Sequence, residues 1–376
     1  MNVIILGSGK IGSIIGREFA SIQKDSKITM ADSVKARASQ ASSAIHGSNW
    51  TTIDITDYQV FVEKLTGYDL IIGALPGDYG WIALKASIEA GVNMLDVSYT
   101  PEDPTVLNRD AEKRSLTIIP DCGVAPGLSS ILVGYATSKL DTVRDAHIMV
   151  GGIPEKPVPP LGYTITWSAD GLVDEYIRDV KIIEKSKTVQ VPALSGLEQI
   201  DFPGVGTLEA FYTDGLRTLA KSITGVESMW EKTLRYPGHV EKVKLLKALG
   251  FFDEEPLKVG EQEVLPKTVT ARLFERSLWM PDVGDLLAMQ ITVRGIVEGK
   301  EKDYKFRVLD YYDHEKEVSA MARTTGYTAA IVAGMLSDGV IKQKGIVTPE
   351  RLGMNHEFTE RLMKQLGKRG IKVESE

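Results

Sequence analysis

The sequence predicts an α/β protein that combines a doubly wound parallel sheet with a second α/β domain containing a mixed, largely antiparallel sheet. Three observations predict this. The chain opens on an apolar strand, a glycine-rich turn and a helix-forming run. Strand and helix signals then alternate to about residue 122, which is typical of parallel sheets covered by helices on both faces. Beyond about residue 140, alternating apolar runs, tight turns and a proline-rich loop favour antiparallel pairing.

The opening segment has the glycine spacing of a Rossmann-type nucleotide-binding turn. Residues 3–6 form an apolar strand, and Gly7, Gly9 and Gly12 follow in G-x-G-x-x-G spacing before a helical run over residues 14–20. Gly7 allows the tight turn, Gly9 lets the backbone approach a pyrophosphate, and Gly12 lets the helix pack on the strand. The N–H groups at the helix start would then bind the phosphates.

A carboxylate stands where an adenosine ribose would be bound. The apolar run 27–31 ends in Asp32, twenty residues after Gly12. A carboxylate there accepts hydrogen bonds from ribose hydroxyls and repels a 2′-phosphate, so we expect NAD rather than NADP. Lys35 and Arg37 lie near enough in the sequence to tolerate that phosphate. The alternative interpretation is a plain turn followed by a solvated acid.

Further elements bring more strand ends to the same edge of the predicted sheet. We expect helices over residues 34–45, 56–65, 81–90 and 103–114, and strands over residues 50–54, 68–75, 92–98 and 116–119. Parallel strands bind ligands at their carboxyl ends. The expected cofactor-binding residues are therefore Gly7, Gly9, Lys10, Ile11, Gly12, Asp32, Asp54, Ala74, Leu75 and Pro76. Asp54 is equally explained as a helix-capping carboxylate, and Leu75 with Pro76 as a plain turn.

The second half predicts strands over residues 143–150, 181–191, 207–213 and 230–236, a hairpin of 289–298 with 302–310, and helices over 171–177, 239–249 and 319–336. We therefore expect a dinucleotide-binding domain over residues 1–122 and a substrate domain over residues 123–320. A C-terminal helical segment over residues 321–376 is expected to pack back on the first domain.

Composition limits the functional classes. The chain has 376 residues, of which 43% are hydrophobic and 25% charged, and its net charge is −7. This acidic balance gives no sign of the excess of Lys and Arg that binds nucleic acid or an anionic membrane. No apolar run approaches the roughly 20 residues that span a bilayer. The single cysteine, Cys122, excludes an intramolecular disulfide, and no signal peptide precedes the first strand. We therefore expect a cytoplasmic protein without nucleic-acid or membrane partners.

Several motifs, in order along nearly the whole chain, resemble those of the saccharopine-dehydrogenase-like family of amino-acid oxidoreductases. They are residues 7–12, 121–127, 151–154, 165–168 and 233–236, and residues 237–242 and 321–323 look most like the lysine 6-dehydrogenase branch. The resemblance implies NAD-dependent oxidation of the lysine ε-amine to an imine, hydrolysis that releases ammonia, and cyclisation of the semialdehyde to a piperideine carboxylate. It also implies a homodimer, and adds Tyr99 and Trp167 to the expected substrate-binding residues.

That chemistry requires a cation for the substrate carboxylate and a group that deals with the amine proton. Arg235 suits the carboxylate because its planar fork forms two hydrogen bonds, although a surface arginine is the alternative. His239, at an expected helix start, is a candidate base or else a histidine bonded to a loop. Asp121 is a second catalytic candidate that could orient the amine or a water, whereas Cys122 is expected to be a packed thiol. The other histidines show no metal-ligand spacing, so we expect no metal.

Two other functional classes remain open. One is a different enzyme of the same family, such as a saccharopine or carboxynorspermidine dehydrogenase. The other is a catalytically silent NAD-binding sensor on the same scaffold. Binding of NADH without turnover of any amine would indicate the sensor.

Overall fold

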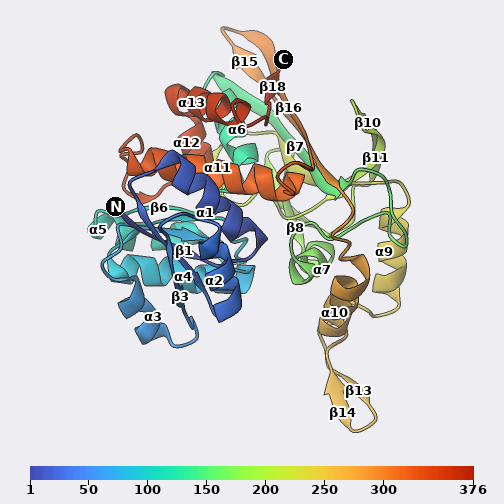
Figure 1. The fold of residues 1–376 in the computed structure, drawn as a ribbon. Coiled ribbons are helices and arrows are strands. Elements are labelled where there is room, and N and C mark those ends of the chain that lie inside the picture. Colours follow the sequence, from blue (N-terminus) through green and yellow to red (C-terminus); the bar gives the residue numbers. More distant parts are fainter. The chain divides into compact units, whose positions relative to one another are not determined.

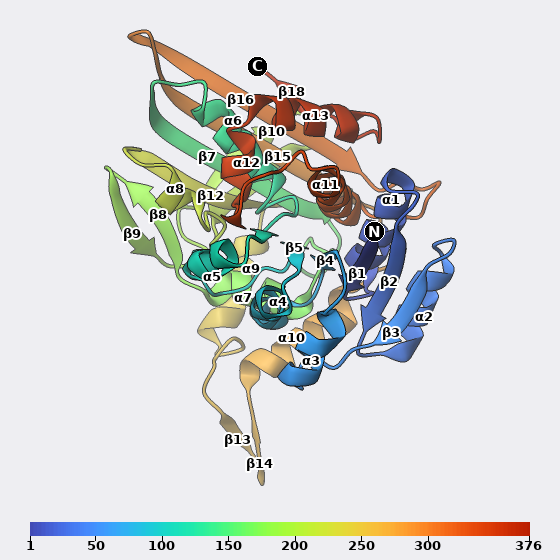
Figure 2. The ribbon, with the colours of Figure 1, turned by 90° about the vertical axis from the view of Figure 1, so that its left-hand side faces the viewer.

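The computed structural model describes all residues, 1–376, and they form two compact units. Unit 1 consists of Met1–Ser138 and Ala322–Gly370, and unit 2 consists of Lys139–Met321 and Ile371–Glu376. Unit 1 therefore extends past residue 122 and includes most of the C-terminal segment. Most helices and strands of both units are labelled in Figures 1 and 2.

Unit 1 is built on a seven-stranded sheet in the order β17-β6-β5-β4-β1-β2-β3, and every pair of neighbours is parallel. This confirms the Rossmann-type sheet. Its apolar core includes side chains of β1, β4, β5 and β6, which are buried because both faces are covered. The strands are β1 (Asn2–Leu6), β2 (Lys27–Asp32), β3 (Asn49–Thr52), β4 (Leu70–Gly73), β5 (Asn93–Asp96), β6 (Thr117–Ile119) and β17 (Gly345–Ile346).

The helices of unit 1 begin and end where local chemistry allows. Asp57 caps α3 by accepting a hydrogen bond from the Val60 N–H, and Gly91, at φ +75°, ends α4. The helices are α1 (Lys10–Ile22), α2 (Lys35–Ser43), α3 (Tyr58–Leu65), α4 (Gly77–Ala90), α5 (Asn108–Lys113), α6 (Leu128–Thr137), α11 (Ala320–Ser337), α12 (Pro349–Gly353) and α13 (His356–Gly367), with a 3₁₀ turn at Pro104–Leu107.

Helices α6 and α12 pack with almost no space between their backbones. A Cβ on Gly134 would lie 2.0 Å from the carbonyl oxygen of Glu350, and one on Gly353 would lie 2.0 Å from that of Ile131. Glycine at both positions is therefore what permits the contact. This contact joins the C-terminal segment to the N-terminal part of unit 1.

Unit 2 contains a nine-stranded sheet in the order β10-β11-β12-β7-β15-β16-β18, with β8 pairing to β12 and β9 to β8. Only β12 and β7 pair in parallel, which confirms a mixed, largely antiparallel sheet. The strands are β7 (Thr142–Pro154), β8 (Val180–Glu184), β9 (Lys187–Val191), β10 (Glu198–Phe202), β11 (Gly206–Tyr212), β12 (Ser228–Arg235), β15 (Asp285–Val297), β16 (Lys300–Tyr311) and β18 (Glu374–Ser375).

The helices of unit 2 are α7 (Ala169–Ile177), α8 (Leu219–Ser222), α9 (His239–Ala248) and α10 (Pro266–Leu278). Side chains of α7, α9 and α10 join those of β11 and β12 in one buried apolar cluster. A separate hairpin of β13 (Leu257–Val259) and β14 (Gln262–Val264) projects beyond α10 in Figures 1 and 2. No helix in either unit is long and apolar enough to cross a membrane.

Candidate active site

The glycine turn of unit 1 is shaped by close backbone contacts on one side and open space on the other. Gly7 has φ +91°, and a Cβ there would lie 2.3 Å from the Ala74 carbonyl oxygen. A Cβ on Gly12 would lie 1.8 Å from the Gly7 carbonyl oxygen, so both positions require glycine. A Cβ on Gly9 would meet nothing within 4 Å. Space therefore remains beside Gly9 for a ligand to approach the backbone.

The N-terminus of α1 opens on that space. Gly9 is the N-cap and provides no side-chain hydrogen bond, and the first turn carries no acidic residue. The first N–H groups of a helix have no partner within the helix and bind anions well. Lys10 and Ile11 lie in this first turn. The residues present thus fit the pyrophosphate of a dinucleotide, and a nicotinamide dinucleotide bound here would supply a hydride acceptor.

Asp32 lies at the carboxyl end of β2 and is held in place by its own unit. One carboxylate oxygen accepts the Ser8 N–H (3.0 Å), and the other accepts the Val34 N–H (2.8 Å). Arg37 lies 3.4 Å from Asp32, with 56% of its own side chain exposed and 8% of the aspartate's. Carboxylate and guanidinium are thus neighbours at the place where an adenosine ribose is expected.

The other expected cofactor residues lie at strand ends of the same sheet. Ala74 follows β4, donates its N–H to the Leu6 carbonyl (2.8 Å) and is the residue that Gly7 contacts. Pro76 is the N-cap of α4, and Leu75 lies between the two. Asp54 follows β3 and is exposed, and its carboxylate accepts hydrogen bonds from the Thr56 N–H and hydroxyl, which lower its pKa. That geometry favours a turn-forming role for Asp54.

Two buried carboxyl groups lie near one another where β5 and β6 end. Asp96 is fully buried and accepts hydrogen bonds from the Ser98 N–H and hydroxyl. Burial raises its pKa well above the usual value, and the charge of Asp121 raises it further. Asp121 is itself 3% exposed and has φ +54°. Tyr99 follows β5 in the same region, with its carbonyl oxygen against Gly77.

Cys122 follows Asp121 and is fully buried. Burial raises the pKa of its thiol, as do the charges of Asp121 and Asp96. A thiol held in its neutral form is a poor nucleophile, so this environment favours packing rather than covalent chemistry.

Unit 2 places Arg235 in a buried cluster of charged and aromatic side chains. Arg235 is 2% exposed, and its guanidinium lies 2.9 Å from Glu175 of α7 and 4.5 Å from the ring centre of Tyr163. Its Nη1 donates to the Leu234 carbonyl, whereas its buried Nε has no partner. The sequence predicted the strand that carries the arginine, but not the arginine's acidic partner, which is sixty residues away.

Trp167 lies in the loop before α7, and its ring packs on the first turn of that helix. A Cβ on Gly171 would lie 2.3 Å from the ring. Ser168 caps the helix by accepting a hydrogen bond from the Gly171 N–H. Trp167 therefore helps to position the helix that carries Glu175.

His239 is bonded at both ring nitrogens. Its Nδ1 lies 3.0 Å from the Leu161 carbonyl oxygen, which can only accept, so Nδ1 carries the proton. Its Nε2 then accepts from the Tyr176 hydroxyl at 2.8 Å. Burial, followed by the charge of Arg235, lowers the pKa of His239 to about 3.

The helix start beside His239 is also occupied. Glu209 accepts hydrogen bonds from the N–H groups of Gly238 (2.7 Å) and Val240 (3.2 Å). The Glu209 carboxylate thus provides hydrogen-bond acceptors for two backbone N–H groups at the N-terminus of α9. His239 is neutral mainly because it is buried, and its engaged nitrogens favour a structural role.

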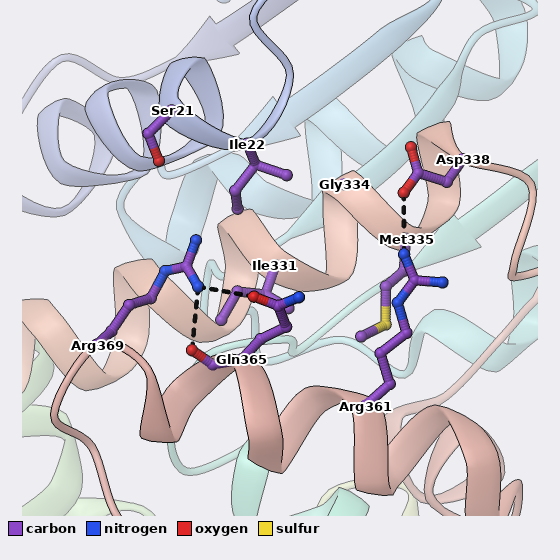
Figure 3. Close-up of a pocket in the computed structure, with 9 residues that line it drawn as sticks. All are labelled: Ser21, Ile22, Ile331, Gly334, Met335, Asp338, Arg361, Gln365 and Arg369. Carbon is purple, nitrogen blue, oxygen red and sulfur yellow. Dashed lines mark hydrogen bonds and ion pairs between the residues drawn. The ribbon is translucent and has the colours of Figure 1, made fainter.

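A cavity of about 270 Å³ lies elsewhere in unit 1, between α1, α11 and α13 (Figure 3). Both arginines that line it, Arg361 and Arg369, form ion pairs or hydrogen bonds with other residues of unit 1. Arg361 lies 3.1 Å from Asp338, and Arg369 bonds Gln365 and Glu18. None of the residues proposed from the sequence lines this cavity. The structure also contains no cluster of three or more histidine, cysteine, aspartate or glutamate side chains that could hold a metal ion.

Comparison with known proteins identifies relatives over nearly the whole chain. Residues 3–119 match the saccharopine dehydrogenase NADP binding domain, and residues 123–371 match the saccharopine dehydrogenase C-terminal domain. Saccharopine dehydrogenase [NADP(+), L-glutamate-forming] of Schizosaccharomyces pombe is 26% identical, over 82% of this chain and 70% of that protein. The Saccharomyces cerevisiae enzyme of the same name is 25% identical, over 97% and 96%.

A carboxyaminopropylagmatine dehydrogenase of Synechocystis is 22% identical, over 93% of this chain and 92% of that protein. The solved structure of apo saccharopine dehydrogenase (L-Glu forming) from Saccharomyces cerevisiae has the same fold, with a TM-score of 0.80 over 100% of this chain and 99% of that one, at 20% identity. Both domain matches agree with the observed fold, which has a glycine turn on a parallel sheet and a mixed second sheet. The chain belongs to the saccharopine dehydrogenase family.

Proposed function

We propose that the protein catalyses NAD-dependent oxidative deamination of the ε-amine of L-lysine, with release of ammonia and formation of the cyclised semialdehyde. The observation that carries this proposal is the buried Arg235–Glu175 pair, whose arginine keeps one unpartnered Nε. An amino-acid substrate is a zwitterion. Arg235 would bind its α-carboxylate and Glu175 its α-ammonium, so the pair complements the head group common to amino acids.

The residues of unit 1 support a nicotinamide cofactor at the glycine turn. We propose NAD because Asp32 would lie against a 2′-phosphate. Arg37 beside it offers a cation that offsets part of this repulsion, so the proposed discrimination is a preference. Hydride leaves the substrate only once its nitrogen has lost a proton, because an ammonium with a pKa of about 10.4 has no lone pair.

Asp121 is the residue that we propose for the second half of the reaction. It lies buried at a strand end of the nucleotide-binding sheet, next to the buried carboxyl of Asp96. A carboxylate there can orient a water molecule for attack on the imine carbon. His239 is proposed to position Tyr176 and the loop of Leu161, since both of its nitrogens are already engaged.

A panel of amines with both oxidised cofactors tests the proposal. L-Lysine alone should reduce NAD, and the test should include saccharopine as well as the reverse reaction of lysine with 2-oxoglutarate and reduced cofactor. Formation of L-glutamate from saccharopine would assign the activity named for the yeast relatives. Activity confined to the condensation of lysine with 2-oxoglutarate would instead indicate the other cleavage of saccharopine, which forms lysine. Binding of NADH without turnover of any amine would indicate a silent sensor. We also propose a homodimer, which light scattering of the purified protein tests.

A further inference from the structure

Strand β12 carries a line of polar side chains on one buried face. Residues two apart in a strand point to the same side, so Glu231, Thr233 and Arg235 share a face. All three are buried, at 5%, 7% and 2% exposure. A buried strand face is ordinarily apolar, and one that carries two charged residues requires partners for them.

The other buried charges around this strand have their partners. Arg235 is paired with Glu175, and Glu209 is bound by the N–H groups at the start of α9. Lys232, on the opposite face, donates to the Gly196 carbonyl and to Glu198, both at 2.6 Å. Their charges are thus compensated inside unit 2.

Glu231 differs from all of them. Its Oε2 is buried and has no hydrogen-bond partner. Its carboxyl packs on the backbone of Gly215, where a Cβ would lie 1.6 Å from Oε1. Burial, followed by the charges of Asp214 and Glu175, both acidic, raises the pKa of Glu231 to about 8. The surroundings therefore lack a cation at this carboxyl.

We propose that Glu231 receives the side-chain ammonium of the substrate. This inference rests on the proposed function, in which Arg235 and Glu175 bind the head group. Residues four apart in a strand lie about 13 Å apart along it, and their side chains can converge on the two ends of one extended ligand. Lysine carries its carboxylate and its ε-ammonium at opposite ends. This face of β12 would thus select a diamino acid by the distance between its two charged ends and by the positive charge of its side chain.

The same carboxylate can accept the proton that must leave before oxidation. The N–H bond of the ammonium breaks, its electron pair stays on nitrogen, and an O–H bond forms at Oε2 of Glu231. The products of this step are a neutral amine and a neutral carboxylic acid. A base whose pKa lies near the working pH is suited to this transfer.

The test measures binding to the enzyme loaded with NADH, which cannot oxidise lysine. Dissociation constants are compared for L-lysine and for 6-hydroxy-L-norleucine, which has the same length and an uncharged end. The wild-type protein should prefer lysine by roughly 10-fold to 100-fold, as expected of a charge-assisted hydrogen bond. Glu231→Gln should reduce this ratio to about one, whereas Glu231→Asp should keep part of it. Glu198→Gln is the matched control and should leave the ratio unchanged.

The wild-type protein provides a second readout that needs no variant. Lysine binding should weaken by up to about tenfold per pH unit below pH 8, because protonation removes the charge of Glu231. Binding of 6-hydroxy-L-norleucine should not follow this trend. An unchanged ligand ratio in a folded Glu231→Gln protein, or lysine binding that does not depend on pH in this range, would overturn the assignment. If lysine binds as predicted and is not oxidised, the proposed function fails while the role of Glu231 stands.

Discussion

At the scale of single residues, the structure separates groups that the sequence treats alike. Arg235 was expected to bind the substrate carboxylate and His239 to act as a base, and both lie near the start of one helix. The arginine keeps an unpartnered Nε beside a carboxylate, whereas the histidine is bonded at both nitrogens. Both residues have a partner on α7, Glu175 for Arg235 and Tyr176 for His239, and the second partner of His239 is Leu161. All three partners lie at least 60 residues away in the sequence.

The buried histidine should make stability depend on pH. His239 has a pKa of about 3 in the folded protein and about 6.5 when unfolded. The unfolded chain therefore gains a proton that the folded one does not, and stability is lost as the pH falls from 6.5 towards 3. This contribution is about 2–3 kcal/mol at pH 4.5. His239→Asn, which can keep the donor to the Leu161 carbonyl, should lose less stability over this range.

Denaturant unfolding between pH 6.5 and 4.5 measures this difference, with the exposed His314→Asn as the control variant. Parallel curves for the wild-type and His239→Asn proteins would show that His239 does not titrate as described. The same variant addresses catalysis. A fall in kcat of about 10²–10⁴-fold without loss of fold would restore His239 as the general base.

Cofactor choice should depend on Asp32 and Arg37. Replacing Asp32 with serine removes the repulsion of a 2′-phosphate, so the ratio of kcat/KM for NAD over NADP should fall by about tenfold or more. Arg37→Gln should move the ratio in the opposite direction, because it removes the neighbouring cation. Steady-state kinetics with both cofactors measures the ratio. A wild-type preference for NADP would contradict the proposed role of Asp32.

At the scale of helices and strands, the sequence predicted those elements whose apolar residues repeat with a clear helical or strand period. Strands β1 to β6 of the parallel sheet and helices α3 and α4 lie within a few residues of their predicted positions, because caps, glycines and apolar runs mark them, whereas the short strand β17 was not predicted. Helix α6 was missed because residues Leu128–Ala136 are all buried, so it has no polar face to reveal its period. Helix α10 was also not predicted, although its sequence contains helix signals: a proline in the first turn, and apolar residues at helical spacing, Ala271, Phe274 and Leu278, which are buried.

The site was predictable only in part for a related reason. Motif positions such as Gly7, Gly12 and Arg235 depend on local sequence, so they could be identified. Pairings such as Glu175 with Arg235 depend on tertiary packing. The alternation of Glu231, Thr233 and Arg235 was the one signal that could have identified the polar face of β12 in advance.

Two glycines of the nucleotide turn should respond differently to alanine. Gly12→Ala places a methyl group against the Gly7 carbonyl and should destabilise the fold by about 1–3 kcal/mol. Gly9→Ala meets no protein atom within 4 Å, at a φ of −72° that alanine adopts easily. It should keep the melting temperature and weaken NADH binding. Thermal melts and NADH titrations of both variants measure this, and normal NADH affinity in Gly9→Ala would mean that the cofactor does not approach there.

At the scale of the whole molecule, the nucleotide-binding unit is discontinuous in sequence. Residues Ala322–Gly370 return to unit 1, where β17 extends the parallel sheet and α12 packs on α6. The sequence led us to expect that residues 321–376 pack back on the first domain, but not which elements make the contact, because both the early and the late segments are ordinary helix and strand sequences. The long range of the contacts is what sequence patterns cannot show.

A chain that ends at Met321 should therefore lose NADH binding, although every residue of the glycine turn is present. The cause is the loss of β17 and of the α6–α12 contact, which leaves an edge strand and a buried helix uncovered. Removing only residues 373–376, which include β18, is the matched control and should preserve binding. Fluorescence titration with NADH compares the two, and retained affinity in the shorter chain would show that the return segment is dispensable.

The most direct test of the account follows the nitrogen that leaves. The protein is incubated with NAD and L-lysine labelled with ¹⁵N at the ε position only, and the ammonia and NADH formed are quantified. Oxidative deamination of the ε-amine should release labelled ammonia in equal amount to NADH. Unlabelled ammonia would place oxidation at the α-carbon, and NADH formed without ammonia, or no NADH from lysine at all, would contradict oxidative deamination of the ε-amine.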